Sequence, residues 1–262
     1  MAEMKFARMQ SEHLKLTPHC STIEELRKLK ADLFVTGSDQ VWGLTLNDYY
    51  DKAYFLPFVK DTKKIAFSSS FGRTDFSDNI IEDYKRLLSK YDSIAVREDS
   101  AVALLNEWGL SCEGQVMDPT LLLDAAYWKN IANKSTPKNY ILVYQIHNKP
   151  SLNQYAKQFS EHVGLPVIRI SPYLHQITRG GKLCWLPNIN GFLSYIRNCS
   201  YLITDSFHGT AFALNFNKQF IEVLEDSVAG IRNKSILKLT HLEDRIVTDL
   251  NDFSISERKI DF

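Results

Sequence analysis

A histidine stands where one predicted strand ends and a helix begins. Residues 201–204 are mostly apolar, and His208 follows them within a run of small and polar residues. In a parallel sheet such strand ends face the ligand cleft, where backbone N–H groups at a helix start attract anions. An imidazole in that position is suited to proton transfer near neutral pH. We therefore interpret His208 as a general acid, with a capping or core histidine as the alternative.

A second strand end carries a carboxylate. Gly37, Ser38 and Asp39 follow a strand predicted at residues 32–36. Small residues leave backbone N–H groups exposed, so we interpret Gly37 and Ser38 as contacts to a phosphate or a sugar. Asp39 is then a base or an acceptor for a sugar hydroxyl. A turn with an N-capping aspartate would produce the same pattern.

Four further residues are candidates for contact with a substrate. Arg97 directly follows a strand, where a guanidinium can hold a carboxylate or a phosphate with two parallel hydrogen bonds. A surface ion pair with Glu98 or Asp99 is the alternative. Trp42 is interpreted as a stacking platform for a sugar ring, although tryptophan is more often part of the core. Ser69 lies in a serine-rich turn, and Arg232 is a candidate for holding an anion.

The composition and charge of the chain exclude several classes of protein. The 262 residues are 44% hydrophobic and 24% charged, which is typical of a soluble globular protein. Lys+Arg and Asp+Glu both number 31, so the net charge offers no case for nucleic acid as a partner. No apolar run reaches the length of a membrane span, and the N-terminus lacks the apolar region of a signal peptide. We therefore expect a cytoplasmic protein.

The cysteines and histidines show no metal-binding pattern. The cysteines form no C-x-x-C pair, so we expect reduced thiols and neither a zinc site nor a disulfide framework. The histidines other than His208 have no metal-ligand spacing with carboxylates, and we predict no metal. Phosphate-loop, dinucleotide-binding and serine-hydrolase motifs are absent from the sequence. The four cysteines are Cys20, Cys112, Cys184 and Cys199.

Short apolar runs alternate with amphipathic segments along the whole chain, which predicts an α/β protein with parallel sheets. The polar segment 133–138 has no periodicity, and we interpret it as a linker between a domain at residues 1–132 and one at 133–262. The predicted strands are residues 32–36, 64–69, 93–96, 140–145, 166–170, 201–204 and 219–223. The predicted helices are residues 21–29, 78–90, 99–107, 152–163, 189–199 and a segment from 210.

Taken together, five motifs resemble the polysaccharide pyruvyl transferase family. The likeness runs from about Thr22 to Arg245, and the order and spacing of the motifs make it specific. The motifs are residues 34–42 (FVTGSDQVW), 68–72 (SSSFG), 96–98 (VRE), 118–123 (DPTLLL) and 204–213 (TDSFHGTAFA).

The resemblance implies a GT-B-like fold of two Rossmann-like halves. It also implies transfer of a pyruvyl group from phosphoenolpyruvate to two hydroxyls of a sugar, in bacterial exopolysaccharide biosynthesis and without a cofactor. The acceptor would be a sugar or a lipid-linked glycan, and a homo-oligomer is left open.

The resemblance also implies roles for particular residues. His208 would be the acid, Asp39 would face the acceptor hydroxyls, and Arg97 would clamp the donor anion. The loop residues Ser206, Phe207 and Gly209 would join Arg97 in holding the donor. Many members carry arginine at the position of Ser206, and Arg232 is our candidate for replacing that cation.

Two alternative functions remain open beside pyruvyl transfer, because the chain departs from the family pattern at its N-terminal end. Family members usually begin with a strand and a glycine loop well upstream of the Gly37 motif, and we expect this first βα unit to be lacking here. Its loss would leave a sheet edge uncovered. The alternatives are therefore a GT-B glycosyltransferase that uses a nucleotide-sugar, and a non-catalytic remnant that binds a glycan or a partner chain.

Overall fold

The computed structural model describes residues 2–45, 47–132, 135–224 and 230–262. The chain divides into two compact units. The N-terminal unit consists of Thr17–Leu122 together with Ser227–Ile236, and the C-terminal unit consists of Met1–Leu16, Leu123–Asp226 and Leu237–Phe262. The sequence places the domain boundary at 132/133, whereas the chain passes from one compact unit to the other at Leu122–Leu123. Residues 133 and 134 of the predicted linker lie outside the described residues.

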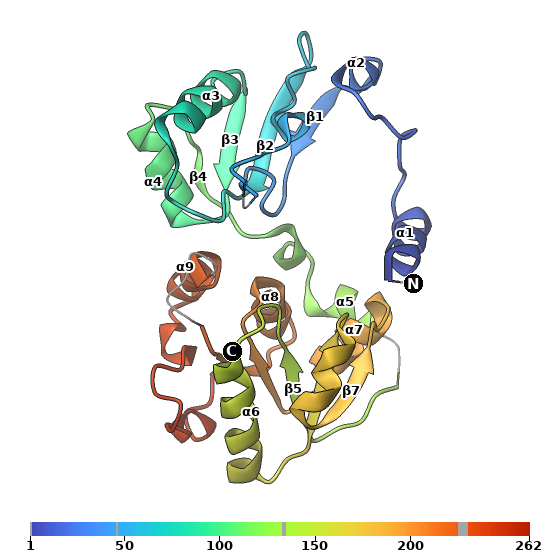
Figure 1. The fold of residues 1–262 in the computed structure, drawn as a ribbon, viewed down its shortest axis with the longest axis vertical. Helices are drawn as coiled ribbons and strands as arrows, with labels where there is room; N and C mark the ends of the chain where they lie inside the picture. The colour runs from blue at the N-terminus through green and yellow to red at the C-terminus, as the bar shows by residue number, and fades with distance from the viewer. Residues whose placement is uncertain (1, 46, 133–134, 225–229) are drawn as a thin grey trace. The chain divides into compact units, whose positions relative to one another are not determined.

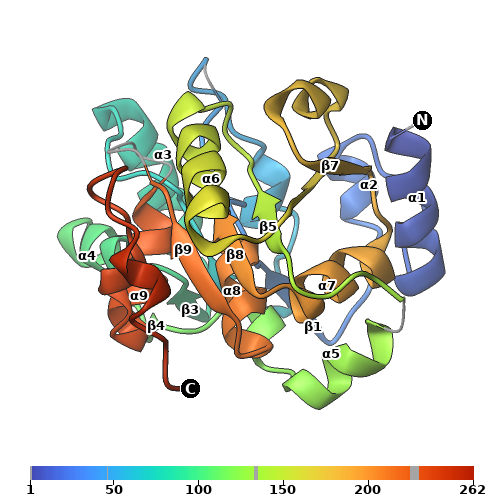
Figure 2. The same ribbon diagram turned by 90° about the horizontal axis from the view of Figure 1, so that it is seen from below.

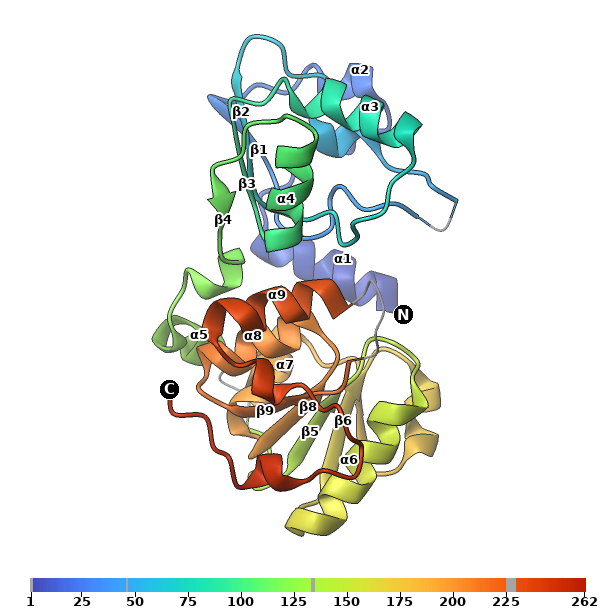
Figure 3. The ribbon, with the colours of Figure 1, turned by 90° about the vertical axis from the view of Figure 1, so that its left-hand side faces the viewer.

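The N-terminal unit contains a parallel four-stranded sheet in the order β1-β2-β3-β4 (Figure 1). Its strands are β1 (Leu33–Thr36), β2 (Lys63–Ser69), β3 (Ser93–Val96) and β4 (Gly114–Gln115). Its helices are α2 (Ile23–Leu26), α3 (Asp78–Leu88) and α4 (Asp99–Glu107), with single 3-10 turns η1 (Lys52–Phe55) and η2 (Pro119–Leu121). The two longest helices, α3 and α4, lie on the same side of the sheet (Figure 3).

An aromatic core fills the space between this sheet and its helices. Trp42, Phe55, Phe71 and Tyr84 are each at most 1% exposed and pack against apolar side chains of β2 and β3. On β1, an edge strand of the sheet, Leu33 and Val35 are 42% and 51% exposed. The side chains of β1 therefore contribute little to this core.

The C-terminal unit contains a parallel five-stranded sheet in the order β7-β6-β5-β8-β9. Its strands are β5 (Ile141–Tyr144), β6 (Val167–Ser171), β7 (Lys182–Trp185), β8 (Tyr201–Thr204) and β9 (Gln219–Glu222). The helices that begin in this part of the chain are α1 (Ala2–His13), α5 (Ala125–Ile131), α6 (Pro150–Val163), α7 (Ile189–Asn198) and α8 (Phe207–Asn215). Further 3-10 turns are η3 (Leu174–Arg179), η5 (Glu243–Arg245) and η6 (Ser254–Ser256).

Helices cover both faces of this second sheet (Figure 2). Side chains of α6 pack on one face in a cluster that contains Ile141 and Val143 of β5. Side chains of α7 and α8 pack on the other face, around Leu142 of β5 and Leu202 of β8. Because β5 is followed along the chain by β6 and β7 on one side and later by β8 and β9 on the other, the β5–β8 pair is the switch point of the sheet.

Helix α9 (Ile231–Thr240) contributes to both units. Its residues up to Ile236 belong to the N-terminal unit, and those from Leu237 belong to the C-terminal unit. Leu237 is fully buried in the core on the α7–α8 face of the second sheet.

The predicted α/β class is confirmed by these two parallel sheets. The predicted helix at 21–29 is shorter than expected, because only Ile23–Leu26 is helical. Thr22 is its N-cap and forms a capping box with Glu25. None of the helices in the described part of the chain combines the length and apolar character needed to cross a membrane.

Candidate functional site

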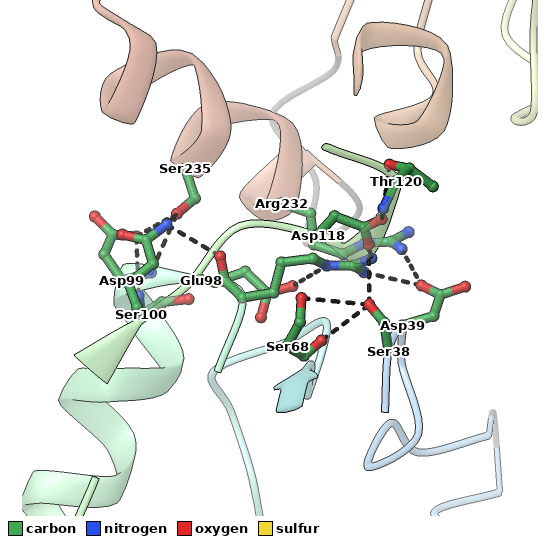
Figure 4. Close-up of polar contacts among 12 residues, drawn as sticks. Ser38, Asp39, Ser68, Glu98, Asp99, Ser100, Asp118, Thr120, Arg232 and Ser235 are labelled. Atoms are coloured by element: carbon green, nitrogen blue, oxygen red, sulfur yellow. Dashed lines mark hydrogen bonds and ion pairs between the residues drawn. The ribbon is translucent and has the colours of Figure 1, made fainter. Parts of the chain in front are cut away.

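The N-terminal unit holds a buried cluster of charges beyond the ends of β1 and β3 (Figure 4). Arg97 is the first residue after β3, and its side chain is 1% exposed. Its Nη2 atom lies 2.9 Å from Asp39 Oδ1, and its Nη1 atom lies 2.7 Å from Asp118 Oδ2. Its Nε atom lies 3.7 Å from Glu98 Oε1. The guanidinium therefore has carboxylates of the same unit on each of its edges.

Asp118 joins this cluster to the turn that follows β4. It caps η2 by accepting a hydrogen bond from the backbone N–H of Thr120, at 3.0 Å, and so fixes this turn. The Ser38 hydroxyl donates to Asp118 Oδ2 at 2.9 Å. Burial raises the pKa of Asp118, but hydrogen bonds from Thr120 and Arg97 outweigh it and hold that pKa below its ordinary value.

Arg232, from α9, completes the cluster. Its Nη1 atom lies 3.0 Å from Asp39 Oδ1, the same oxygen that Arg97 contacts. Burial and the nearby charge of Arg97 lower the pKa of Arg232. The Asp39 side chain is 53% exposed. This carboxylate therefore contacts two largely buried guanidinium groups on one side and solvent on the other. The structure thus brings together Asp39, Arg97 and Arg232, which the sequence singled out separately.

Glu98 is the second buried acid of this cluster. It is 1% exposed, and burial raises its pKa. Once Glu98 is protonated, the charges of Arg97 and Arg232 equal those of Asp39 and Asp118. The cluster is then neutral in total, which is the state that burial favours.

Three of the predicted contact residues are enclosed by the protein. Arg97 has no surface open to a donor anion in this structure, because its donors face carboxylates. Trp42 is 0% exposed and stacks on Phe55 with ring centroids 5.9 Å apart, so it belongs to the core and offers no face to a sugar. Ser69 is also fully buried, and its hydroxyl donates to the Thr36 carbonyl at 3.1 Å, which ties β2 to β1.

Gly37 is required by the backbone at the end of β1. Its φ is +126°, a region that side chains rarely adopt. A Cβ atom there would lie 2.0 Å from the Phe67 carbonyl oxygen. The strand end can therefore approach β2 only because this residue is glycine.

In the C-terminal unit, His208 lies in the first turn of α8, directly beyond β8. It is half-buried, and its ring meets the ring of Phe207 edge-on with centroids 5.4 Å apart. Ser206 is the N-cap and accepts a hydrogen bond from the Gly209 N–H at 3.3 Å. A Cβ atom on Gly209 would lie 2.7 Å from Thr204 Oγ1, so glycine is needed for the helix to start so close to the strand. Ser206, Phe207 and Gly209 thus shape the turn that presents His208.

A pocket of about 460 Å³ lies beside His208 at the ends of β5, β6 and β7. Its lining is mainly apolar and aromatic, and Ser171 and His208 are among its few polar side chains. Aromatic walls of this kind suit a flat or apolar group. The aromatic residues that line the pocket are Trp128, Tyr144, Phe192 and Phe212.

One pair of residues in the C-terminal unit was not predicted from the sequence. His147 follows β5, and its Nδ1 atom lies 3.1 Å from Oδ2 of Asp205, which follows β8. The available signal was position, because His147 follows a predicted strand just as His208 does. Its spacing from carboxylates in the sequence carries no such signal, because Asp205 lies 58 residues away.

Asp39 and Arg97, which are separate candidates in the sequence analysis, are in contact. Their roles toward a substrate, and the role of His208, stay predictions. Among the residues that the structure describes, no group of three or more His, Cys, Asp or Glu side chains is placed to hold a metal ion.

Comparison with solved structures identifies the architecture. A UDP-GlcNAc 2-epimerase from Methanocaldococcus jannaschii is similar with a TM-score of 0.58 and 12% sequence identity, covering 97% of this chain and 81% of that one. S. aureus MnaA, solved with UDP, is similar with a TM-score of 0.54 and 14% identity, covering 97% and 84%. At such identities the likeness shows the GT-B-like fold alone.

Comparison of sequences identifies the family. No curated protein matches the chain. The family model for polysaccharide pyruvyl transferases matches residues 4–227, a range that includes all five motifs. Since that match spans most of its length, the chain belongs to the polysaccharide pyruvyl transferase family.

Proposed function

We propose that this protein transfers a pyruvyl group from phosphoenolpyruvate to two hydroxyls of a sugar and leaves a cyclic ketal. The acceptor would be a sugar or lipid-linked precursor of a bacterial surface glycan, modified in the cytoplasm. The observation that carries the proposal is the position of His208, in the first turn of α8 at the switch point of the sheet, in a chain of this family.

The chemistry of phosphoenolpyruvate explains why an imidazole would be needed there. Its methylene carbon must gain a proton as the neighbouring carbon bonds to a sugar oxygen, and His208 is the proposed donor. Its phosphate and carboxylate are anionic, and the N-terminal end of a helix stabilises negative charge. The α8 turn would therefore supply both the acid and an attraction for the donor.

In the N-terminal unit we propose that Asp39 accepts a hydrogen bond from the acceptor sugar. Its side chain is half-exposed, and Arg97 and Arg232 hold it from the buried side. This replaces the donor clamp expected of Arg97 with a positioning role, because the Arg97 guanidinium already faces carboxylates. Arg232 would act with it on the same carboxylate.

A second candidate function is suggested by the aromatic pocket beside His208. A volume of about 460 Å³ is large for a three-carbon donor, and the lining is mainly apolar rather than cationic. The S. aureus neighbour was solved with UDP, and a M. jannaschii neighbour with UDP-GlcNAc and UDP. A nucleotide-sugar substrate is the candidate that this pocket favours.

Calorimetric titration with phosphoenolpyruvate, UDP and UDP-GlcNAc separates these functions. We expect phosphoenolpyruvate to bind, and we expect phosphate release in the presence of methyl glycosides of galactose, glucose or mannose, with the ketal identified by mass spectrometry. Binding of UDP-GlcNAc alone would support the nucleotide-sugar reading. A folded protein that binds none of the three ligands would instead support the non-catalytic reading.

The His208→Asn variant tests the acid directly. We expect it to bind phosphoenolpyruvate but to form no ketal, since the amide cannot supply the proton. The matched control is His162→Asn, at an exposed histidine near the end of α6, which should keep wild-type turnover. Wild-type turnover in His208→Asn would remove this residue from the reaction.

A further inference from the structure

We propose that His147 is the base that removes a proton from the acceptor hydroxyl, and that Asp205 is its positioning residue. The inference rests on the proposed pyruvyl transfer and deepens it. It starts from the switch point of the second sheet, where β5 and β8 are neighbours in register, with Tyr144 opposite Thr204. The Thr204 hydroxyl donates to the Tyr144 carbonyl at 2.6 Å and ties the two strand ends together. His147 follows one of these strand ends, and His208 follows the other.

Asp205 fixes both the backbone and the ring of His147. One carboxylate oxygen accepts the backbone N–H of Ile146 at 2.7 Å. The other accepts the backbone N–H of His147 at 2.9 Å and lies 3.1 Å from its Nδ1 atom. The Asp205 side chain is 7% exposed, so these bonds are shielded from water. A buried carboxylate with three contacts to one loop residue and its neighbour leaves that loop little freedom.

The flanking residues of the loop are held as firmly. The Arg179 guanidinium donates to Gln145 Oε1 at 2.8 Å and also to Asn148 Oδ1. The Gln145 side-chain amide donates to the Lys149 carbonyl at 2.8 Å. His147 therefore projects from a loop braced on both sides, which is the preorganisation that a reacting group needs.

These contacts define the chemistry of the ring. A carboxylate at Nδ1 favours the tautomer that carries its proton on Nδ1, which leaves a lone pair on Nε2. The His147 side chain is 38% exposed, and no hydrogen bond joins its Nε2 atom to another described residue. An oriented imidazole with an accessible lone pair is a general base. Asp39 is less suited to this role, because its Oδ1 atom already binds two guanidinium groups.

His147 and His208 together account for every proton that moves in the proposed reaction. The first acceptor hydroxyl gives its proton to His147 Nε2 as its oxygen bonds to C2 of phosphoenolpyruvate, and the C2–C3 π electrons take a proton from His208 at C3. The second hydroxyl oxygen then bonds to C2 as the C2–O bond to phosphate breaks. Its proton returns to His208, and the proton on His147 leaves with the phosphate. Both imidazoles end as they began, and no further reactant is consumed.

The tautomer of His147 can be measured without any substrate. In ¹⁵N NMR spectra of the full chain with labelled histidine, we expect the neutral His147 ring to carry its proton on Nδ1, assigned by loss of the signal in His147→Gln. In Asp205→Asn that preference should disappear, while the exposed His162 keeps the ordinary Nε2-protonated form in both proteins. A wild-type His147 ring protonated on Nε2 would overturn the positioning role of Asp205.

Turnover tests the base itself, with phosphoenolpyruvate and the methyl glycosides named above. We expect His147→Gln to lower kcat by about 10²- to 10⁴-fold while the Kd for phosphoenolpyruvate stays unchanged. We expect added imidazole to restore activity to His147→Gly, which a merely structural loop residue would not show. A folded His147→Gln protein with wild-type kcat would overturn the assignment. Inactivity of the wild type with every ligand would count against the proposed function, and the tautomer measurement would still decide the Asp205–His147 pairing.

Discussion

At the scale of single residues, the charge cluster around Arg97 is held by burial as much as by pairing. Two guanidinium groups and three carboxylates share the end of the first sheet, and Arg97 and Asp118 are each at most 2% exposed at the side chain. Ions so enclosed are stabilised only while their partners are present, since water cannot replace them. The cluster should therefore respond strongly to loss of a single member.

Arg97→Ala is expected to lower the free energy of unfolding by about 3–5 kcal/mol, because it leaves buried carboxylates without a counter-charge. Urea unfolding followed by circular dichroism measures the change. The control is Arg73→Ala in the same unit, where the partner Asp75 is 69% exposed, and the unfolding curve should stay close to that of wild type. Equal effects in the two variants would show that the Arg97 pairs contribute no more than surface pairs.

Glu98 gives the cluster a dependence on pH. Burial raises its pKa above the ordinary value of 4.5, so the folded protein keeps a proton at pH values where the unfolded chain has released it. Stability therefore falls as the pH rises through the interval between these two pKa values. Glu98→Gln removes the ionisable group, and with it this decrease in stability at rising pH. We expect the variant to gain unfolding free energy relative to wild type between about pH 5 and about pH 8, measured by urea unfolding. If the variant and wild type differ in unfolding free energy by the same amount at about pH 5 and at about pH 8, the raised pKa of Glu98 is contradicted.

The sequence identified residues at strand ends, but it did not predict which of their side chains are buried. Asp39, Arg97 and His208 were singled out because charged or titratable residues at strand ends are recognisable in sequence. Whether a side chain at a strand end faces solvent or a buried partner depends on contacts made by distant segments. Trp42 shows this most plainly, since its motif is at a strand end and its ring is in the core.

At the scale of elements, the turn between β8 and α8 depends on its cap. The Ser206 hydroxyl accepts the Gly209 N–H, and six of the nine residues of the helix that follows are buried. We expect Ser206→Ala to lower the unfolding free energy by about 1 kcal/mol. The control is Ser77→Ala at the start of α3, where the side chain makes no capping hydrogen bond, and little change is expected. Thermal unfolding of both variants decides the point, and equal shifts would show that the Ser206 cap adds nothing.

Alternation of apolar and amphipathic segments predicted seven strands close to their observed positions. The strand β7 was missed although Leu183, Cys184 and Trp185 form a short apolar run, and none of its four residues is buried. The strand β4 was missed because it has two residues. Short edge strands such as these are defined by the neighbour with which they pair, which a single segment of sequence does not encode.

At the scale of the whole chain, the division into two halves was predicted, but the assignment of one late segment was not. By their position in the chain, residues 227–236 fall in the predicted C-terminal domain, yet Ser227–Ile236 belongs to the N-terminal unit. There the Ser235 hydroxyl lies 3.1 Å from Asp99 Oδ1 and accepts from the Gln115 amide at 3.0 Å. Local patterning reports whether a helix forms and which face is apolar, but it does not report which sheet the helix joins.

A fragment ending at the predicted boundary, residues 1–132, should consequently be less stable than the same unit in the full chain. It lacks Arg232 and Ser235, so Asp39 and Asp99 lose contacts made from α9. Hydrogen exchange compares the amides of β1 to β3 in the fragment and in the full chain, and we expect weaker protection in the fragment. A synthetic peptide of residues 227–240 should restore part of it. Equal protection without the peptide would show that the late segment is dispensable.

The recruitment of residues 227–236 also has a consequence for biosynthesis. A ribosome releases the nascent chain from its N-terminus, so the strands β1 to β3 emerge long before the segment that completes their charge cluster. Until Arg232 has been translated, Asp39 can pair with Arg97 but not with its second guanidinium. The strands of the first sheet are therefore synthesised long before Arg232, and a chaperone that binds the emerging polypeptide would meet this sheet without that contact for most of translation.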